Sequence, residues 1–141
     1  MASFDSIPLF STLSPQARQF LASMTQERIL EPEQVLFHEG EEANAFYVVV
    51  SGSLSVFHPC GEDACKIVNI IHPGEPVGEM ALFAERKERR NASVKAEERS
   101  VIIVFPDFTI NMLREKEPAI LEALQQIIQA RVEMNAEKRD V

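Results

Sequence analysis

The most informative part of this 141-residue chain reads Gly78-Glu-Met-Ala-Leu82 and, further on, Arg90-Asn-Ala-Ser-Val-Lys-Ala96. Good helix formers follow Gly78, so we expect a short helix that begins at this glycine. The N-terminus of a helix favours an anion through its free N–H groups and its dipole. Arg90 would add a planar, positively charged guanidinium group that can donate hydrogen bonds to phosphate oxygens. Glu79 would repel that anion, so it fits the site only as the acceptor for a hydroxyl group beside the phosphate.

These residues together favour a sugar phosphate with a free hydroxyl as the ligand. The alternative is that Glu79 stabilises its own helix N-terminus and that Arg90 is a surface residue. Local spacing leaves both interpretations open.

Short segments rich in Val, Ile, Phe and Tyr surround this region, with turn residues between them. They are Gln34–His38, Phe46–Val50, Ser53–Phe57, Lys66–Ile71, Ala92–Ala96 and Val101–Phe105. Regularly spaced strands of this kind predict an antiparallel sandwich or barrel. The predicted fold class is mainly β with flanking helices.

Helices are predicted on both sides of the β region. Ser14 is expected to cap a helix that has Pro15 at its first position. Asp107 is expected to cap a second helix, and Pro118 to open a third. The third helix has an apolar stripe on roughly one face, formed by Ile120, Leu121, Leu124, Ile127, Ile128 and Val132. The chain is predicted to be one domain over residues 1–141, with a helical segment at 1–27, a β-roll at 28–106 and C-terminal helices at 107–138.

Composition and charge exclude several classes of protein. The 45% hydrophobic and 26% charged residues are ordinary for a globular domain. The net charge of −8 argues against binding of a nucleic acid backbone by the whole chain. The one local excess of positive charge lies at residues 86–90, and such a run is usually a solvated loop. The apolar runs are far shorter than the ~20 residues of a membrane span, and the N-terminus lacks the features of a signal peptide. We therefore expect a cytoplasmic protein with no membrane contact.

Metal sites and catalysis are not predicted. His58, Cys60 and Cys65 offer three zinc ligands, but the chain has no second Cys/His pair to close a tetrahedral site. The three histidines are dispersed without a His-x-His pair, which argues against a metal-dependent cupin barrel. Hydrolysis of a cyclic phosphodiester would need a metal cluster or a placed base, and neither is visible. We expect no enzyme activity, no metal and no cofactor.

The segments Gly78–Leu82 and Arg90–Ala96 resemble the phosphate-binding cassette of cyclic nucleotide-binding domains. Such domains occur in catabolite activator protein, in regulatory subunits of cyclic-AMP-dependent kinase and in nucleotide-gated channels. Leu36–Gly52 is similar to the glycine-punctuated strand pair of the family, and Phe10–Pro15 to its N-terminal helical segment. The resemblance implies an eight-stranded β-roll, a double-stranded β-helix of the jelly-roll type, with a short helix in the cassette and helices at the C-terminus.

The resemblance also implies a role for each matching residue, with cAMP or cGMP as the ligand. Backbone N–H groups of the short helix meet the cyclic phosphate, and these residues match Gly78, Met80, Ala81 and Leu82. Glu79 matches the acceptor for the ribose 2′-hydroxyl, and Arg90 the partner of the phosphate. Ser93 matches a hydroxyl residue close to phosphate or base, and Asn91 and Ala92 complete the set of binding residues.

The sequence departs from the family at three points. The connection between Leu82 and Arg90 is longer than usual, and Arg89 stands where many members have proline, so Arg89 would compete with Arg90 for the phosphate. Asn91 stands where cAMP binders often have alanine and cGMP binders threonine, which leaves the base preference open.

The function expected from the resemblance is that of a stand-alone cyclic nucleotide sensor that signals through its C-terminal helix to a homodimer partner or an effector protein. Direct DNA binding is not expected, because the chain ends at Val141 without a helix-turn-helix module. The alternative is a dimerisation module of the same fold that binds no ligand.

Overall fold

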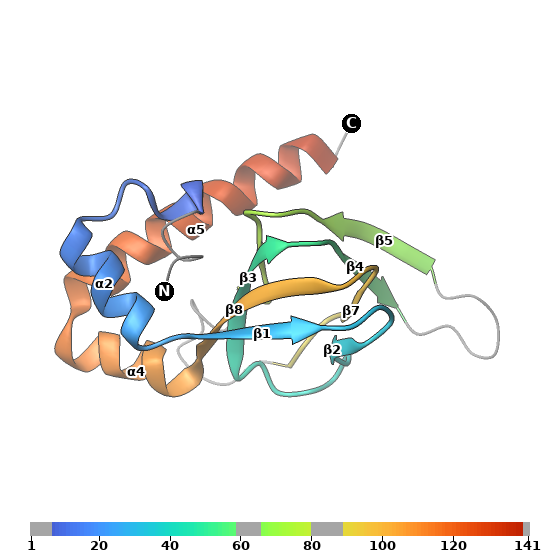
Figure 1. Cartoon of the computed structure of the whole chain (residues 1–141), viewed down its shortest axis with the longest axis horizontal. Coiled ribbons are helices and arrows are strands. Elements are labelled where there is room, and N and C mark those ends of the chain that lie inside the picture. The colour runs from blue at the N-terminus through green and yellow to red at the C-terminus, as the bar shows by residue number, and fades with distance from the viewer. Residues whose placement is uncertain (1–6, 59–65, 80–88, 140–141) are drawn as a thin grey trace.

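Two four-stranded antiparallel sheets form the body of the protein, and the helices pack against one side of it (Figure 1). This computed structural model describes residues 7–58, 66–79 and 89–139. Its elements in chain order are η1 (Pro8–Phe10), α2 (Pro15–Ser23), β1 (Gln26–Leu30), β2 (Val35–Phe37), β3 (Ala45–Ser51), β4 (Leu54–His58), β5 (Lys66–Ile71), β6 (Pro76–Val77), β7 (Ser93–Ala96), β8 (Ser100–Pro106), α4 (Asp107–Lys116) and α5 (Pro118–Arg139). The strand order is β1-β8-β3-β6 in the first sheet and β2-β7-β4-β5 in the second.

This architecture confirms the predicted fold class of a β-roll with flanking helices. The six predicted strands all form, and no strand end differs from its predicted position by more than one residue. Two further strands were not predicted. The first, β1, has only Leu30 buried, so it lacks the alternation that marks a half-buried strand. It forms because it pairs along its whole length with β8 at the edge of the first sheet. The second, β6, has only two residues, Pro76 and Val77.

The central strands of the first sheet are apolar on both faces, because each face is covered. On β3, Phe46 and Val48 face the helices, whereas Tyr47 and Val49 face the second sheet. Successive side chains of a strand point to opposite faces, so one strand serves two hydrophobic clusters. This is why residues 45–50 form a continuous apolar run rather than an alternating one.

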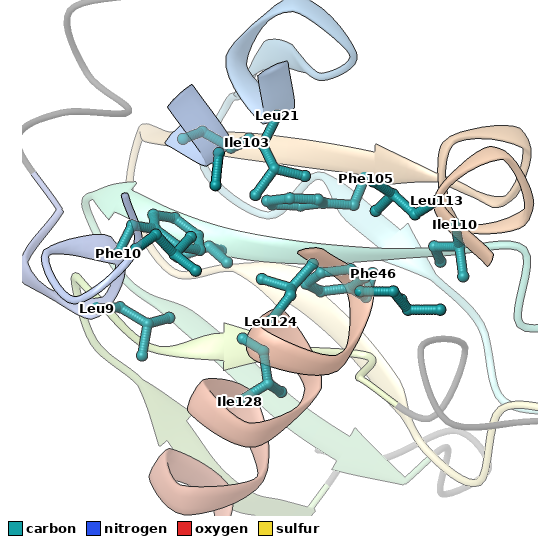
Figure 2. Close-up of a cluster of buried hydrophobic side chains, with 14 of the residues drawn as sticks. Leu9, Phe10, Leu21, Phe46, Ile103, Phe105, Ile110, Leu113, Leu124 and Ile128 are labelled. Carbon is teal, nitrogen blue, oxygen red and sulfur yellow. The ribbon is translucent and has the colours of Figure 1, made fainter. Parts of the chain in front are cut away.

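The cluster on the helical side is built around stacked aromatic rings. Phe46 and Phe105 are register partners on β3 and β8, and their ring centroids lie 4.2 Å apart. Figure 2 shows side chains from α2, α4 and α5 around these rings, with Leu21, Leu113 and Leu124 among them. All of these side chains are fully buried, so the helices are fixed to the outer face of the first sheet.

The helix boundaries follow the predicted signals with one exception. Ser14 caps α2 by accepting a hydrogen bond from the Ala17 N–H at 3.1 Å, and Pro118 is the first residue of α5. Asp107 is the first residue of α4 and not its cap; the capping position is held by Pro106, whose side chain makes no capping bond. The helical segment expected over residues 1–27 also ends earlier, since α2 stops at Ser23.

The predicted cassette helix falls mostly on residues 80–88, which lie outside the described residues. Among the helices that the structure describes, none is long and apolar enough to cross a membrane.

Candidate functional site

A cavity of about 270 Å³ lies where the two sheets meet near β6. Its walls come from β2, β4, β5, β6 and β7 and from the segments that follow β6 and precede β7. Most lining residues are apolar, as in ligand pockets generally. The polar side chains among the described lining residues are Asn69, Glu79, Arg90 and Asn91.

The guanidinium group of Arg90 is the buried charge of this cavity. Only 3% of the residue is exposed. Its Nη1 donates to the Gly78 carbonyl at 3.0 Å, and its Nη2 donates to the Ala45 carbonyl at 2.6 Å. Its Cζ lies 4.1 Å from the centroid of the Phe37 ring, a cation–π arrangement. The Nε–H is buried and has no hydrogen-bond partner among the described residues.

The electrostatic environment of Arg90 is unusual for an arginine. Burial lowers the pKa of its guanidinium group from the ordinary value, while Tyr47, Glu79 and Glu41 act in the opposite direction. The group stays protonated, because arginine does not lose its proton in proteins. A buried positive charge held by carbonyl oxygens and an aromatic face is therefore available to an anion in the cavity.

Gly78 is the residue that allows Arg90 to take this position. Its φ is +70°, a left-handed conformation that favours glycine. A Cβ atom on Gly78 would lie 2.7 Å from Nη1 of Arg90 and 3.2 Å from the Phe37 ring. Glycine is thus favoured here by the backbone conformation, and a side chain at this position would displace the guanidinium group.

The turn at residues 38–42 holds the backbone on which Arg90 stands. The Gly40 N–H donates to the Arg90 carbonyl at 2.9 Å, and the Arg90 N–H donates to the Glu41 carbonyl at 2.7 Å. The side chain of Arg89 is exposed and donates to the Gly40 carbonyl at 2.8 Å. Arg90 therefore lines the cavity, whereas the side chain of Arg89 holds the turn at residues 38–42.

Ser93 also contacts the turn at residues 38–42. It is fully buried at the start of β7, and its hydroxyl oxygen accepts a hydrogen bond from the Glu39 N–H at 2.9 Å. The Glu39 carboxylate in turn lies 2.9 Å from Nδ1 of His58 on β4. The hydroxyl of Ser93 is thus engaged with the turn.

The structure brings most of the predicted site residues to one cavity. Its lining includes Gly78, Glu79, Arg90, Asn91 and Ala92. Met80, Ala81 and Leu82 lie outside the described residues.

The other lining residues are not predicted from the sequence, and two of them, Phe37 and Asn69, matter for the chemistry of the cavity. Phe37 lies under the Arg90 guanidinium group, and nothing in its local sequence signals this contact. Asn69 does carry a signal, because it is the lone polar residue in the apolar run Ile67–Ile71.

Metal binding has no structural support in the described part of the chain. Within residues 7–58, 66–79 and 89–139, no group of three His, Cys, Asp or Glu side chains is arranged to hold an ion. Cys60 and Cys65, considered as zinc ligands with His58, lie outside these ranges.

Comparison with known families gives one family match. The sequence model for the Cyclic nucleotide-binding domain matches residues 27–117. A Rhodopseudomonas palustris sequence described as a potassium channel protein is 29% identical over 130 residues, covering 92% of this chain and 30% of that protein. The Cyclic AMP receptor protein of Thermus thermophilus is 29% identical over 109 residues, covering 76% of this chain and 49% of that protein. The chain therefore spans half or less of the length of these relatives.

The fold also has solved counterparts. The crystal structure of a cyclic nucleotide-binding domain from Methylobacillus flagellatus matches with a TM-score of 0.80 at 17% identity. The match covers 98% of this chain and 76% of that one. At this level of identity the similarity is one of fold.

Proposed function

The chain belongs to the cyclic nucleotide-binding domain family, and we propose on that basis that it binds a cyclic purine nucleotide, cAMP or cGMP, in the cavity beside Arg90. The observation that carries the proposal is the buried guanidinium group of Arg90 with its unpartnered Nε–H. A buried donor without a partner costs about 1–3 kcal/mol. The cyclic phosphate, a single negative charge with acceptor oxygens, would offset that cost.

The second polar group of the site is the carboxylate of Glu79. It lines the same cavity and acts on Arg90 through its negative charge. A carboxylate beside a phosphate site is unfavourable unless it accepts hydrogen bonds. In the proposed complex it accepts from the 2′-hydroxyl of the ribose, while Asn91 and Ala92 border the ligand from the strand side.

Ser93 is proposed to act on the ligand indirectly. Its hydroxyl oxygen already accepts from the Glu39 N–H. By holding the turn at residues 38–42 it keeps the Arg90 backbone in place, and through it the phosphate site.

Signalling is proposed to run from the cavity to α5. Pro76 and Val77 of β6 line the cavity, and α5 contacts β6. Ligand binding next to β6 would favour one position of α5, and that helix would present the change to a second copy of the chain or to an effector. The role is regulatory, with no catalytic step.

The test of the proposal is calorimetric titration with cAMP and cGMP. Arg90→Ala should weaken binding by about 1.5–3 kcal/mol, the worth of a hydrogen bond to a charged group. Arg89→Ala is the matched control and should bind as the parent does, because Arg89 contacts the turn. Thermal melts of both variants check that they fold.

A second arm of the titration addresses the ribose. The parent should bind a 2′-deoxy cyclic nucleotide more weakly than the ribonucleotide, and Glu79→Gln should lose most of that difference. If the parent takes up neither nucleotide at millimolar concentration, the chain is a ligand-free dimerisation module. If Arg89→Ala is the variant that fails to bind, the assignment of the phosphate to Arg90 is wrong.

A further inference from the structure

One wall of the cavity is formed by residues of β4 and β5. The described lining residues on these strands are Val56, Val68, Asn69 and Ile71, so one polar side chain stands among apolar ones. Asn69 is the register partner of Val56. Phe57, the next residue of β4, pairs with Ile67, which leaves Val68 as the extra residue of a β-bulge.

This local geometry is typical of a binding site. Bulges are enriched next to sites, where they redirect side chains. Asparagine is disfavoured in strands, and a fully apolar residue at position 69 would continue the run from Ile67 to Ile71. The fold itself therefore gives no reason for an amide at this position.

The amide nitrogen of Asn69 lacks a partner among the described residues. Its Nδ2 is buried and makes no hydrogen bond with any described residue. Such a donor is costly unless something else satisfies it. Because the χ2 torsion of asparagine is soft, a small rotation directs either the nitrogen or the oxygen of the amide into the cavity.

One part of the proposed ligand remains to contact the wall formed by β4 and β5. In the proposed complex, the phosphate and the ribose are contacted by Gly78, Glu79 and Arg90. The base is the remaining part of a cyclic nucleotide. We infer that Asn69 reads the edge of the base and makes the site prefer adenine. This inference rests on the proposed function and adds a specificity-determining residue to it.

The preference follows from the pattern of donors and acceptors. An amide presents a donor beside an acceptor, which matches N7 and the 6-amino group of adenine. The same edge of guanine presents two acceptors, N7 and O6, so only one of the two bonds forms. A site with a buried amide also rejects ligands that leave the amide unpaired.

The experiment compares cAMP with two analogues by calorimetry. One is the cyclic purine ribonucleotide that lacks the 6-amino group, and the other is 7-deaza-cAMP, which lacks the N7 acceptor. The parent should bind each analogue roughly 5- to 100-fold more weakly than cAMP. Asn69→Leu, which has a similar size and no hydrogen-bonding groups, should bind all three ligands alike.

Ser55→Ala is the matched control. Ser55 is fully buried on β4, its Oγ also has no partner among the described residues, and it is not among the residues that line the cavity. This variant should keep the discrimination of the parent. Asn69→Val, which suits a strand better, replaces the leucine variant if thermal melts show that the latter does not fold.

Two outcomes separate this inference from the proposed function. If both Asn69 variants discriminate among the ligands as strongly as the parent, the base is read elsewhere and Asn69 has no such role, although cyclic nucleotides still bind. If the parent binds none of these three ligands and no cGMP either, the proposed function itself fails and this inference falls with it.

Discussion

Gly78 and Arg90 depend on each other, because the guanidinium group lies in the space that a side chain at position 78 would fill. We predict that Gly78→Ala lowers affinity for cyclic nucleotide roughly tenfold or more, since Arg90 must move away from a Cβ at 2.7 Å. It should also destabilise the fold by roughly 1–2 kcal/mol, the cost of a left-handed conformation at an alanine.

Gly74→Ala provides the control for this prediction. Gly74 has a similar φ of +86°, but a Cβ atom there would meet nothing within 4 Å. Urea unfolding should show a comparable loss of stability for Gly74→Ala, while calorimetry should show unchanged affinity. Equal affinities for the two variants would mean that the space at Gly78 is unimportant for the ligand.

Tyr47 reports on the same site, because it is the single tyrosine of a chain without tryptophan. Burial raises the pKa of Tyr47 above its ordinary value, and the positive charge of Arg90 partly opposes that rise. We predict that phenolate absorbance appears at a higher pH in the folded protein than in urea. Arg90→Met should raise the pKa further, because it removes the opposing charge.

The shift of Tyr47 has a consequence for stability. Its contribution is fully present below the ordinary tyrosine pKa of about 10. It is lost as the pH rises from there through the higher pKa of the folded state, because the unfolded chain releases the proton first. Tyr47→Phe should show a shallower loss of stability over that range in urea unfolding. Titration of the folded parent at or below the pKa found in urea would contradict the prediction.

At the scale of elements, α5 is held to its own molecule by one edge of its apolar stripe. Leu121, Leu124 and Ile128 are buried in the cluster on the helical side, whereas Ile120 and Ile127 are only partly buried against it. The partly buried edge is the part of the stripe that the proposed partner, a second copy or an effector, would contact.

The proposed role of α5 as the output element predicts a change in hydrogen exchange. A ligand shifts a conformational equilibrium only when it binds one state more tightly. If α5 is held more firmly in the state that binds the ligand, saturating cAMP or cGMP should slow amide exchange over residues 118–133. General stabilisation by the ligand slows exchange throughout the fold. The informative quantity is therefore the slowing in α5 relative to α2, and equal slowing in both helices would reject α5 as the output.

At the scale of the whole molecule, the first sheet separates two apolar clusters and belongs to both. The carbonyl of Ala45 on β3 accepts from Arg90, and the next residue, Phe46, packs among the helices. The ligand cavity and the helical side are thus joined by adjacent residues of one strand. In the proposed signalling, a shift of the guanidinium group would reach the helical cluster over a single peptide unit.

Local patterns in the sequence were sufficient for the elements that carry their own signal. The apolar runs of β3, β5 and β8, the capping serine at position 14 and the proline at 118 predicted elements that the structure confirms. The cassette segments Gly78–Leu82 and Arg90–Ala96, together with the two motifs before them, predicted the family, because their residues are specific and follow one another in the order of the family.

Only the tertiary structure decided what depends on distant partners. The strands β1 and β6 exist because β8 and β3 pair with them. The choice between Arg89 and Arg90 as the cavity residue depends on the turn at residues 38–42, and the positions of Phe37 and Asn69 depend on how the two sheets pack. Pairing and packing join residues far apart in the chain, and no local periodicity records which of them meet.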